Sequence, residues 1–334
     1  MRITVLAGGI GGARFLRGLL AVTPRPEVTV IGNTADDVTL HGLRVCPDLD
    51  TVMYTLGGGI HEGQGWGRQD ETFGVAAELT AYGQQPTWFT LGDRDLATHI
   101  VRTRLLGQGL TLSQVTARLC ERWQPGVRLL PMSDDRVETH VVVDDPTGEP
   151  DATGAPARKA VHFQEWWVRL HAAVPARQIL AVGIESATPA PGVIEAIRDA
   201  DVVILPPSNP VVSVGTILGV PGVRQALRET AAPVVGVSPI VGGAPVRGMA
   251  DACLTAIGVE TSAAAVAGLY ADVVDGWLVD DADAATAALA LAGRRGAQAL
   301  AVRARPLLMT DLEATAAIAA AAIDLAGELT ATHA

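Results

Sequence analysis

Short apolar runs, each closed by glycine, proline, serine or asparagine, alternate along the chain with segments of helical periodicity. Helical patterns occur at Ala13–Ala21, Gly192–Ala200 and Val223–Thr230. Because strands that alternate with helices form sheets with parallel strands, the pattern predicts an α/β fold with a doubly wound, mostly parallel sheet. The predicted strands are Arg2–Leu6, Glu27–Ile31, Trp88–Leu91, Gln178–Val182, Val202–Leu205 and Val234–Val237.

The alternation breaks between about Leu96 and Val174. We interpret residues 96–174 as a mixed α/β insertion, or cap, on a single domain that spans residues 1–334. Within it the pattern predicts a helix at Leu112–Trp123, a strand at Glu138–Val143, a polar turn-rich run from Asp144 to Pro156, and a further element at Phe163–His171.

Composition narrows the class of protein. Hydrophobic residues make up 49% of the chain and aromatic residues only 4%, so aliphatic side chains must fill the buried sheet. The net charge of −11 and the lack of a basic run argue against nucleic-acid binding. Cys46, Cys120 and Cys253 lack metal-ligand or redox spacing, which indicates a reducing compartment. A strand opens the chain, and acidic residues interrupt the alanine-rich segment Thr310–Ala334, so we expect a cytoplasmic protein with no membrane span.

The first strand ends in the glycine-rich turn Gly8-Gly9-Ile10-Gly11-Gly12. Glycines let the backbone approach a phosphate, and the following helix offers its N-terminal N–H groups. The turn therefore predicts phosphate binding in a Rossmann-like fold, although a plain strand-to-helix connection would use the same residues. NAD binding is disfavoured, since Arg14 replaces the third glycine of the dinucleotide motif and Asn33 replaces the ribose-binding acid. The lysine of a Walker loop is absent too.

Carboxylates gather after the second and third predicted strands. Asp36-Asp37 and the segment Pro47–Thr51 offer ligands suited to Mg²⁺ and to sugar hydroxyls, or serve as ordinary turn and helix caps. Gly92–Asp95 places two acids around an arginine, which suits phosphate contacts or a surface ion pair.

Uncharged polar groups follow the later strands. Ser208-Asn209 and Ser213 lie after one strand, and Gly242-Gly243 lies after the next. Such hydroxyl, amide and backbone N–H groups form anion sites without formal charge, but they are also common loop residues. Because ligands of open α/β sheets bind beyond the carboxyl ends of the strands, we expect these groups to face the first glycine turn.

Together these segments resemble the 2-phospho-L-lactate transferase family CofD, whose actinobacterial, phosphoenolpyruvate-transferring members are called FbiA. The resemblance covers about residues 1–250. Its motifs are Ala7–Arg14, Gly32-Asn33-Thr34, Pro47–Thr51, Trp66-Gly67, Asp70–Phe73, Leu91–Asp95, Pro207–Pro210, Ser213-Val214-Gly215 and Ser238–Gly243.

The resemblance implies a Mg²⁺-dependent transferase of substituted phosphate groups in the biosynthesis of the deazaflavin coenzyme F420. It would move a phosphoenolpyruvyl or 2-phospholactyl group from a guanosine-diphosphate-linked three-carbon acid to the terminal ribityl hydroxyl of the deazaflavin Fo, and release GMP. The composition, rich in arginine and nearly free of lysine, favours the actinobacterial donor, phosphoenolpyruvate. Relatives that share the glycine turn but only bind nucleotide sugars leave a regulatory binding protein as the alternative.

The resemblance also implies roles for individual residues. It makes Asp50 and Asp93 catalytic, and it makes Asp50 and Asp48 metal ligands. Many archaeal members carry lysine where Thr90 stands, so a charged contact to Fo is not expected there. The apolar C-terminal helix suggests a homodimer. The residues implied for Fo are Asp50, Thr51, Trp88, Thr90, Gly92 and Asp93. Those implied for the donor are Gly9, Gly11, Gly12, Asn33, Ser208, Asn209, Ser213, Gly242 and Gly243.

Overall fold

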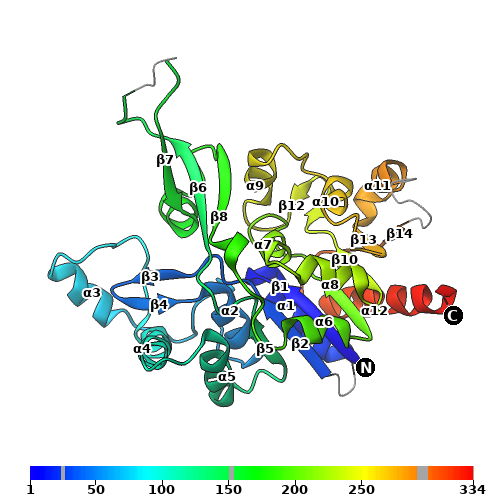
Figure 1. Cartoon of the computed structure of the whole chain (residues 1–334), viewed down its shortest axis with the longest axis horizontal. Helices are drawn as coiled ribbons and strands as arrows, with labels where there is room; N and C mark the ends of the chain where they lie inside the picture. The colour runs from blue at the N-terminus through cyan, green and yellow to red at the C-terminus, as the bar shows by residue number, and fades with distance from the viewer. Residues whose placement is uncertain (24–26, 150–153, 292–299, 334) are drawn as a thin grey trace.

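The computed structural model describes residues 1–23, 27–149, 154–291 and 300–333. Its centre is a parallel sheet with the strand order β14-β13-β10-β9-β1-β2-β5 (Figure 1). The strands are β1 (Arg2–Ala7), β2 (Glu27–Gly32), β5 (Arg128–Pro131), β9 (Val202–Leu205), β10 (Val234–Val237), β13 (Gly276–Val279) and β14 (Ala301–Ala304).

The direction of winding reverses at β1. From β1 the chain moves outward through β2 to β5, and it then returns to β9, on the other side of β1, and moves outward to β14. The carboxyl ends of β1 and β9 therefore form the switch point at which open α/β sheets bind their ligands. The predicted doubly wound α/β fold is confirmed.

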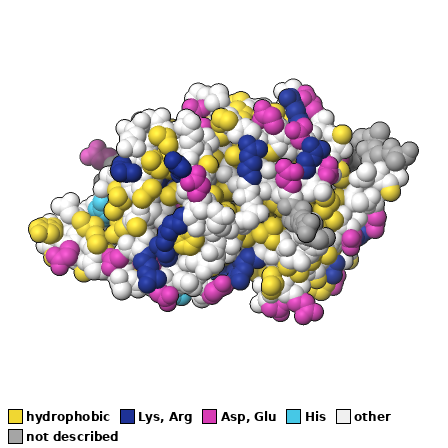
Figure 2. Space-filling view, turned by 90° about the horizontal axis from the view of Figure 1, so that it is seen from below, with side chains coloured by type: hydrophobic (Ala, Val, Ile, Leu, Met, Phe, Trp, Pro, Cys, Tyr) yellow, Lys and Arg dark blue, Asp and Glu magenta, His cyan; other side chains and the backbone are white. Residues whose placement is uncertain are grey.

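Helices cover both faces of the sheet, and on the face of the molecule shown in Figure 2 acidic side chains lie among the basic ones. Along β1 the side chains of Ile3, Val5 and Ala7 face one buried cluster and Leu6 faces the other, as the two-residue period of a strand requires. The first cluster is covered by α1 (Gly9–Val22), α2 (Pro47–Leu56), α5 (Leu112–Trp123) and α12 (Leu312–His333). The second is covered by α6 (Val193–Arg198), α7 (Val214–Gly219), α8 (Val223–Glu229), α9 (Ala250–Ala256), α10 (Ala263–Leu269) and α11 (Ala284–Leu291).

The C-terminal helix α12 packs on α1. By length and composition alone, Leu312–Ala331 could cross a membrane, but 39% of that window is buried inside the protein. A Cβ atom at Gly18 of α1 would lie 2.5 Å from the backbone of Thr315, so a glycine is needed for this close approach. Packing against α1 and the sheet accounts for the apolar stripe, and a dimer formed through this helix stays a prediction.

A small antiparallel sheet projects from the core (Figure 1). It consists of β6 (Glu138–Asp144), β7 (Arg158–His162) and β8 (Gln178–Val182), in the order β7-β6-β8. The prediction that Gln178–Val182 joins the central sheet is wrong, because β8 pairs antiparallel with β6 and its apolar residues are only partly buried. The central strand β5 also lies within residues 96–174, the range expected to form an insertion.

A second projection holds the hairpin β3 (Val38–Leu40) and β4 (Leu43–Val45) with the helices α3 (Gly74–Ala81) and α4 (Asp93–Gly107) (Figure 1). The predicted strand Trp88–Leu91 lies here as an irregular segment, so that prediction is wrong. Its apolar side chains are accounted for by a small separate cluster, in which Leu91 packs with residues of the hairpin and α4. The neighbour of β2 in the sheet is instead β5.

Candidate active site

The glycine turn after β1 is joined to the loop after β9 at the switch point. Ser208 Oγ accepts a hydrogen bond from the Gly8 N–H (3.2 Å) and donates one to the Gly8 carbonyl oxygen (2.8 Å). A Cβ atom at Gly11 would lie 2.2 Å from the Pro207 carbonyl oxygen, and one at Gly12 would lie 2.7 Å from Ser208 Oγ. These glycines therefore let the turn contact the loop directly. The turn leads into α1, whose N-cap residue, Gly8, has no side chain to cap the helix.

Asn33, at the end of β2, connects three elements beside this turn. Its side chain is fully buried. Asn33 Nδ2 donates to Asp48 Oδ2 (2.9 Å), and its Oδ1 accepts from the Ala35 N–H (3.0 Å) and from Thr216 Oγ1 (2.8 Å). Asn33, predicted to bind the donor, is thus engaged within the protein and positions Asp48.

The loop after β9 is held in shape by Asn209. Its Oδ1 accepts from the N–H groups of Val211 (2.9 Å) and Val212 (3.1 Å), and the Ser213 N–H donates to the Asn209 carbonyl oxygen (3.3 Å). Ser213 is buried, and its side chain lies next to Gly8. The structure therefore brings Ser208 and Ser213 to the first glycine turn, while Asn209 shapes the loop that carries them.

The second glycine pair lies in the tight turn between β11 (Ile240–Val241) and β12 (Ala244–Pro245). Gly242 and Gly243 both have positive φ angles, 59° and 77°. Their N–H groups point together and bind the carboxylate of Asp283, at 2.9 and 3.2 Å. This is the geometry of an anion site, but it is occupied by the protein's own side chain. Donor binding at these glycines stays a prediction.

Four buried carboxylates follow β2 and begin α2. Two of them have an arginine partner: Asp37 pairs with Arg44 at 3.0 Å, and Asp50 pairs with Arg102. Asp36 and Asp48 have none among the described residues. Asp48 also lies against the glycine turn, with Oδ2 2.7 Å from the position of a Cβ atom at Gly8.

The two unpaired carboxylates resist ionisation, and so does Asp37, whose pKa burial raises to about 6 although Arg44 opposes the shift. Burial, and then the charges of Asp48 and Asp37, raise the pKa of Asp36 well above its usual value. Burial raises the pKa of Asp48 to about 6, although hydrogen bonds from Asn33 and the Gly9 N–H oppose the shift. Uncompensated buried negative charge of this kind is relieved by a cation. Within the described ranges, no group of three histidine, cysteine or acidic side chains is arranged to hold a metal by itself.

Asp50 belongs to a buried network between α2 and α4. Arg102 contacts Asp50 Oδ1 and, through Nη1, the Nδ1 atom of His99 at 3.0 Å. His99 Nε2 lies 3.2 Å from Asp95 Oδ2, and Tyr54 donates to Asp95 Oδ1 at 2.7 Å. Among the described residues, the buried Asp50 Oδ2 has no hydrogen-bond partner, and it lies 3.8 Å from His99 Nδ1. Sequence reasoning missed Arg102 and His99, because their spacing on α4 carries no recognisable motif.

Asp93 caps a helix. Its carboxylate accepts from Thr72 Oγ1 (2.6 Å) and from the N–H groups of Gly74 (2.9 Å) and Val75 (3.0 Å), at the start of α3. In return, Glu71 accepts from the first N–H groups of α4. These hydrogen bonds hold the pKa of Asp93 below its usual value. The Asp93 carboxylate is therefore engaged in the cap, and its catalytic role stays a prediction.

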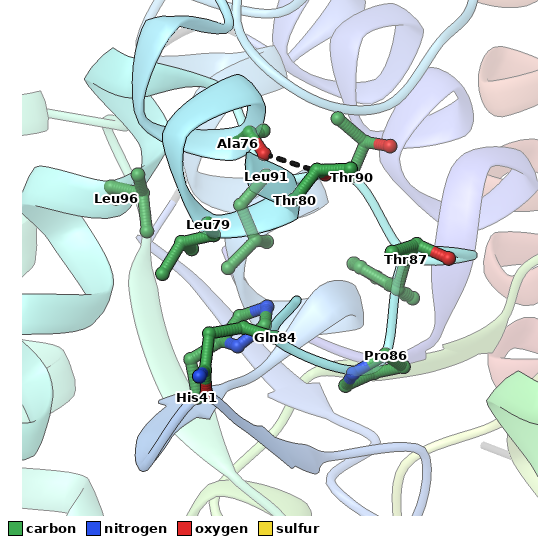
Figure 3. A pocket seen from close by; sticks show the side chains of 11 residues that line it. His41, Ala76, Leu79, Thr80, Gln84, Pro86, Thr87, Thr90, Leu91 and Leu96 are labelled. Atoms are coloured by element: carbon green, nitrogen blue, oxygen red, sulfur yellow. Dashed lines mark hydrogen bonds between the residues drawn. The ribbon is translucent and has the colours of Figure 1, made fainter. Parts of the chain in front are cut away.

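The residues predicted for Fo do not line one pocket. Thr90 lines a pocket between α3, the β3–β4 turn and the segment after α3 (Figure 3). Trp88 is half-buried outside it, and Asp50 and Thr51 are buried on α2. A Cβ atom at Gly92 would contact Glu71, so that glycine serves packing between the two caps.

The fold and this site are those of a Rossmann-like α/β protein whose glycine turn lies at the switch point, where open α/β sheets bind their ligands. A model of the 2-phospho-L-lactate transferase family CofD matches residues 3–317, and the chain belongs to this family. Proteins called phosphoenolpyruvate transferase are 64% identical in Kitasatospora aureofaciens (332 residues) and Thermobifida fusca (338 residues), and 54% identical in Mycolicibacterium smegmatis (342 residues). Each alignment covers 98% of this chain and 99% of the relative.

Among solved structures, protein BH3568 of Bacillus halodurans is similar in fold. The TM-score is 0.61 at 18% sequence identity, and the match covers 96% of this chain and 99% of the other. At this identity the likeness concerns the fold alone. It supports the α/β architecture that the strand and helix pattern predicts.

Proposed function

We propose that this transferase moves the phosphoenolpyruvyl group from a guanosine-diphosphate-linked donor to the terminal ribityl hydroxyl of Fo, and releases GMP, on the route to coenzyme F420. The hydroxyl oxygen would bond to the phosphorus distal to guanosine, the bond from that phosphorus to the bridging oxygen would break, and the hydroxyl proton would be lost. The names of the relatives favour phosphoenolpyruvate over 2-phospholactate as the transferred group. A cytoplasmic location is part of the proposal, supported by three free cysteines.

One observation carries the proposal. At the switch point the glycine turn meets the Ser208 loop and Asp48, and Asp36 lies close enough to Asp48 for their charges to interact. N–H donors suit phosphate oxygens, and buried carboxylates without a cation suit a divalent metal that phosphate also binds. Diphosphate and metal would therefore be held by neighbouring groups of the same site.

Asp36 and Asp48 would hold the Mg²⁺ ion. This replaces Asp50 in the pair expected from the resemblance, because Asp50 is already neutralised by Arg102 while Asp36 is not. Two carboxylates suffice, since Mg²⁺ commonly completes its shell with water and substrate phosphates. When bound, the ion would neutralise phosphate charge in the transition state.

The remaining catalytic work is positioning. Phosphoryl transfer requires alignment and charge stabilisation more than covalent help from the protein. Asp50 is held by Arg102 and retains a buried oxygen, Oδ2, that has no hydrogen-bond partner among the described residues. We assign to it the orientation of the attacking hydroxyl. Asp93 we assign to holding α3 and α4 together near the pocket that contains Thr90.

The alternative is a regulatory protein that binds nucleotide sugars without transfer. Purified protein is incubated with Fo, Mg²⁺ and the enolpyruvyl guanosine donor, and release of GMP is followed by chromatography. The transferase releases GMP only when Fo is present. A binding protein releases none, and its melting temperature rises with nucleotide sugars but not with Fo.

A further inference from the structure

Arg14 lies in the second turn of α1, and Arg247 lies beside the first turn of the same helix. Arg14 is one helical turn after Ile10 on α1, and Arg247 belongs to the loop between β12 and α9. The position that a Cβ atom would take at Gly65 is 2.9 Å from Arg247 Nη1 and 3.0 Å from Ile10 Cγ2. The Arg247 guanidinium therefore reaches the first turn of α1 from a segment far away in the sequence.

Neither arginine has an acidic partner among the described residues. In the described part of the chain, no carboxylate oxygen lies within ion-pair distance of either guanidinium, and neither donates a hydrogen bond. A third arginine nearby does have a partner: Arg17, on the next turn of α1, pairs with Glu62 at 3.0 Å. The two guanidiniums are thus available to bind an anion, although the protein carries a net charge of −11.

The two positive charges also repel each other. Burial lowers the pKa of Arg14, and the charge of Arg247 lowers it further, while Glu62 acts in the opposite direction. Holding like charges together is unfavourable in the free protein, and a bound anion would relieve the repulsion. Guanidinium groups match phosphate oxygens in geometry as well as in charge.

We propose that Arg14 and Arg247 together bind the diphosphate of the nucleoside diphosphate donor at the start of α1. The proposal rests on the proposed function for the choice of donor. Arg247, exposed on its loop, supplies a contact from outside the helix, and Arg14 supplies one from within it. A guanosine moiety without phosphate gains nothing from either residue.

The test measures binding of GDP in Mg²⁺ buffer by isothermal titration calorimetry. Arg14→Gln and Arg247→Gln each weaken GDP binding about tenfold or more, and the double variant about a hundredfold, as expected for charge-assisted hydrogen bonds. Guanosine binding stays within about twofold of the unchanged protein, which places the loss at the phosphates. The matched control is the double variant Arg17→Gln/Glu62→Gln, which removes an arginine of the same helix together with its carboxylate partner and leaves GDP binding unchanged.

Melting temperatures of the ligand-free variants separate binding from folding. Removing one of two repelling charges leaves the melting temperature unchanged or raises it. The assignment is overturned if both glutamine variants bind GDP as well as the unchanged protein, if guanosine and GDP binding fall equally, or if the unchanged protein binds no GDP. A failed transfer assay with the arginine effect on GDP intact would refute only the proposed reaction.

Discussion

Asp50 and Arg102 form an ion pair inside the protein, with side chains only 7% and 1% exposed. The pair joins α2 to α4, the helices that carry the buried carboxylates and the reciprocal caps. Breaking a buried pair leaves one charge without compensation, which costs more than the pair itself contributes.

We expect Asp50→Asn to lower the free energy of unfolding by roughly 3 kcal/mol, because Arg102 then stays buried without a countercharge. Urea unfolding measures the change. The double variant Asp50→Asn/Arg102→Met removes both charges and loses less stability than the two single variants added together. An additive double variant would show that the two residues are not coupled.

Asp93 offers a test of capping against catalysis. Asparagine caps helices nearly as well as aspartate, whereas alanine cannot. Asp93→Asn therefore keeps the slow hydrogen exchange of the Gly74 and Val75 amides and keeps transfer activity, while Asp93→Ala loses the protection and raises the KM for Fo. If asparagine abolishes activity while the amides stay protected, the charge of Asp93 acts in the reaction.

The glycine turn owes its composition partly to packing. Gly11→Ala would place a methyl group 2.2 Å from the Pro207 carbonyl oxygen, a backbone atom that cannot rotate away. We expect a loss of about 1–3 kcal/mol in thermal or urea unfolding, together with weaker GDP binding. Gly327→Ala, in α12 with open space around it, is the control and leaves both properties nearly unchanged. A harmless Gly11→Ala would contradict the contact between turn and loop.

Local patterns predicted much of the fold. The amphipathic segment Leu112–Trp123 forms α5 with the predicted bounds, helped by a capping box at Thr111. Trp88–Leu91 carries the apolar content of a strand, but its side chains pack in a small separate cluster. The short strands β13 and β14 were not predicted, since a four-residue run has too little periodicity to identify.

The site was predictable where residues lie next to one another in sequence. The contact of the glycine turn with Ser208 follows from the rule that ligands bind at the carboxyl ends of parallel strands. The pairing of Asp50 with Arg102 does not follow, because the two lie on different helices 52 residues apart. Which carboxylate remains unpaired therefore depends on tertiary packing, and Asp36 replaced Asp50 as a metal-binding candidate for that reason.

The raised pKa of Asp48, about 6, predicts a pH dependence of stability. An unfolded aspartate titrates near about 3.9, so between about pH 4 and 6 the folded state binds more protons and loses stability as the pH rises. Asp48→Asn removes this loss. The stability of Asp48→Asn relative to the unchanged protein, both in EDTA, should grow through that window by on the order of 3 kcal/mol, and then level off. A difference that shrinks as the pH rises would contradict the raised pKa.

Mg²⁺ should offset the loss of stability that follows ionisation of Asp48, since the metal binds the ionised carboxylates. Mg²⁺ should raise the melting temperature more at about pH 7.5 than at about pH 5, and it should raise that of Asp48→Asn little at either pH. The control is Asp283→Asn, which changes a different buried acid, the one that accepts hydrogen bonds from the Gly242 and Gly243 N–H groups. This variant keeps the Mg²⁺ response. Equal responses at both pH values would remove the support for Asp36 and Asp48 as ligands.

Mass spectrometry of the deazaflavin product tests the central claim most directly. The protein is given Fo, Mg²⁺ and equal amounts of the enolpyruvyl and lactyl guanosine donors, whose products differ in mass by two hydrogens. We predict a product whose mass equals that of Fo plus the phosphoenolpyruvyl group, with GMP formed in equal amount. Fo recovered unchanged, with no GMP released from either donor, would contradict the assignment of this protein as a transferase to Fo.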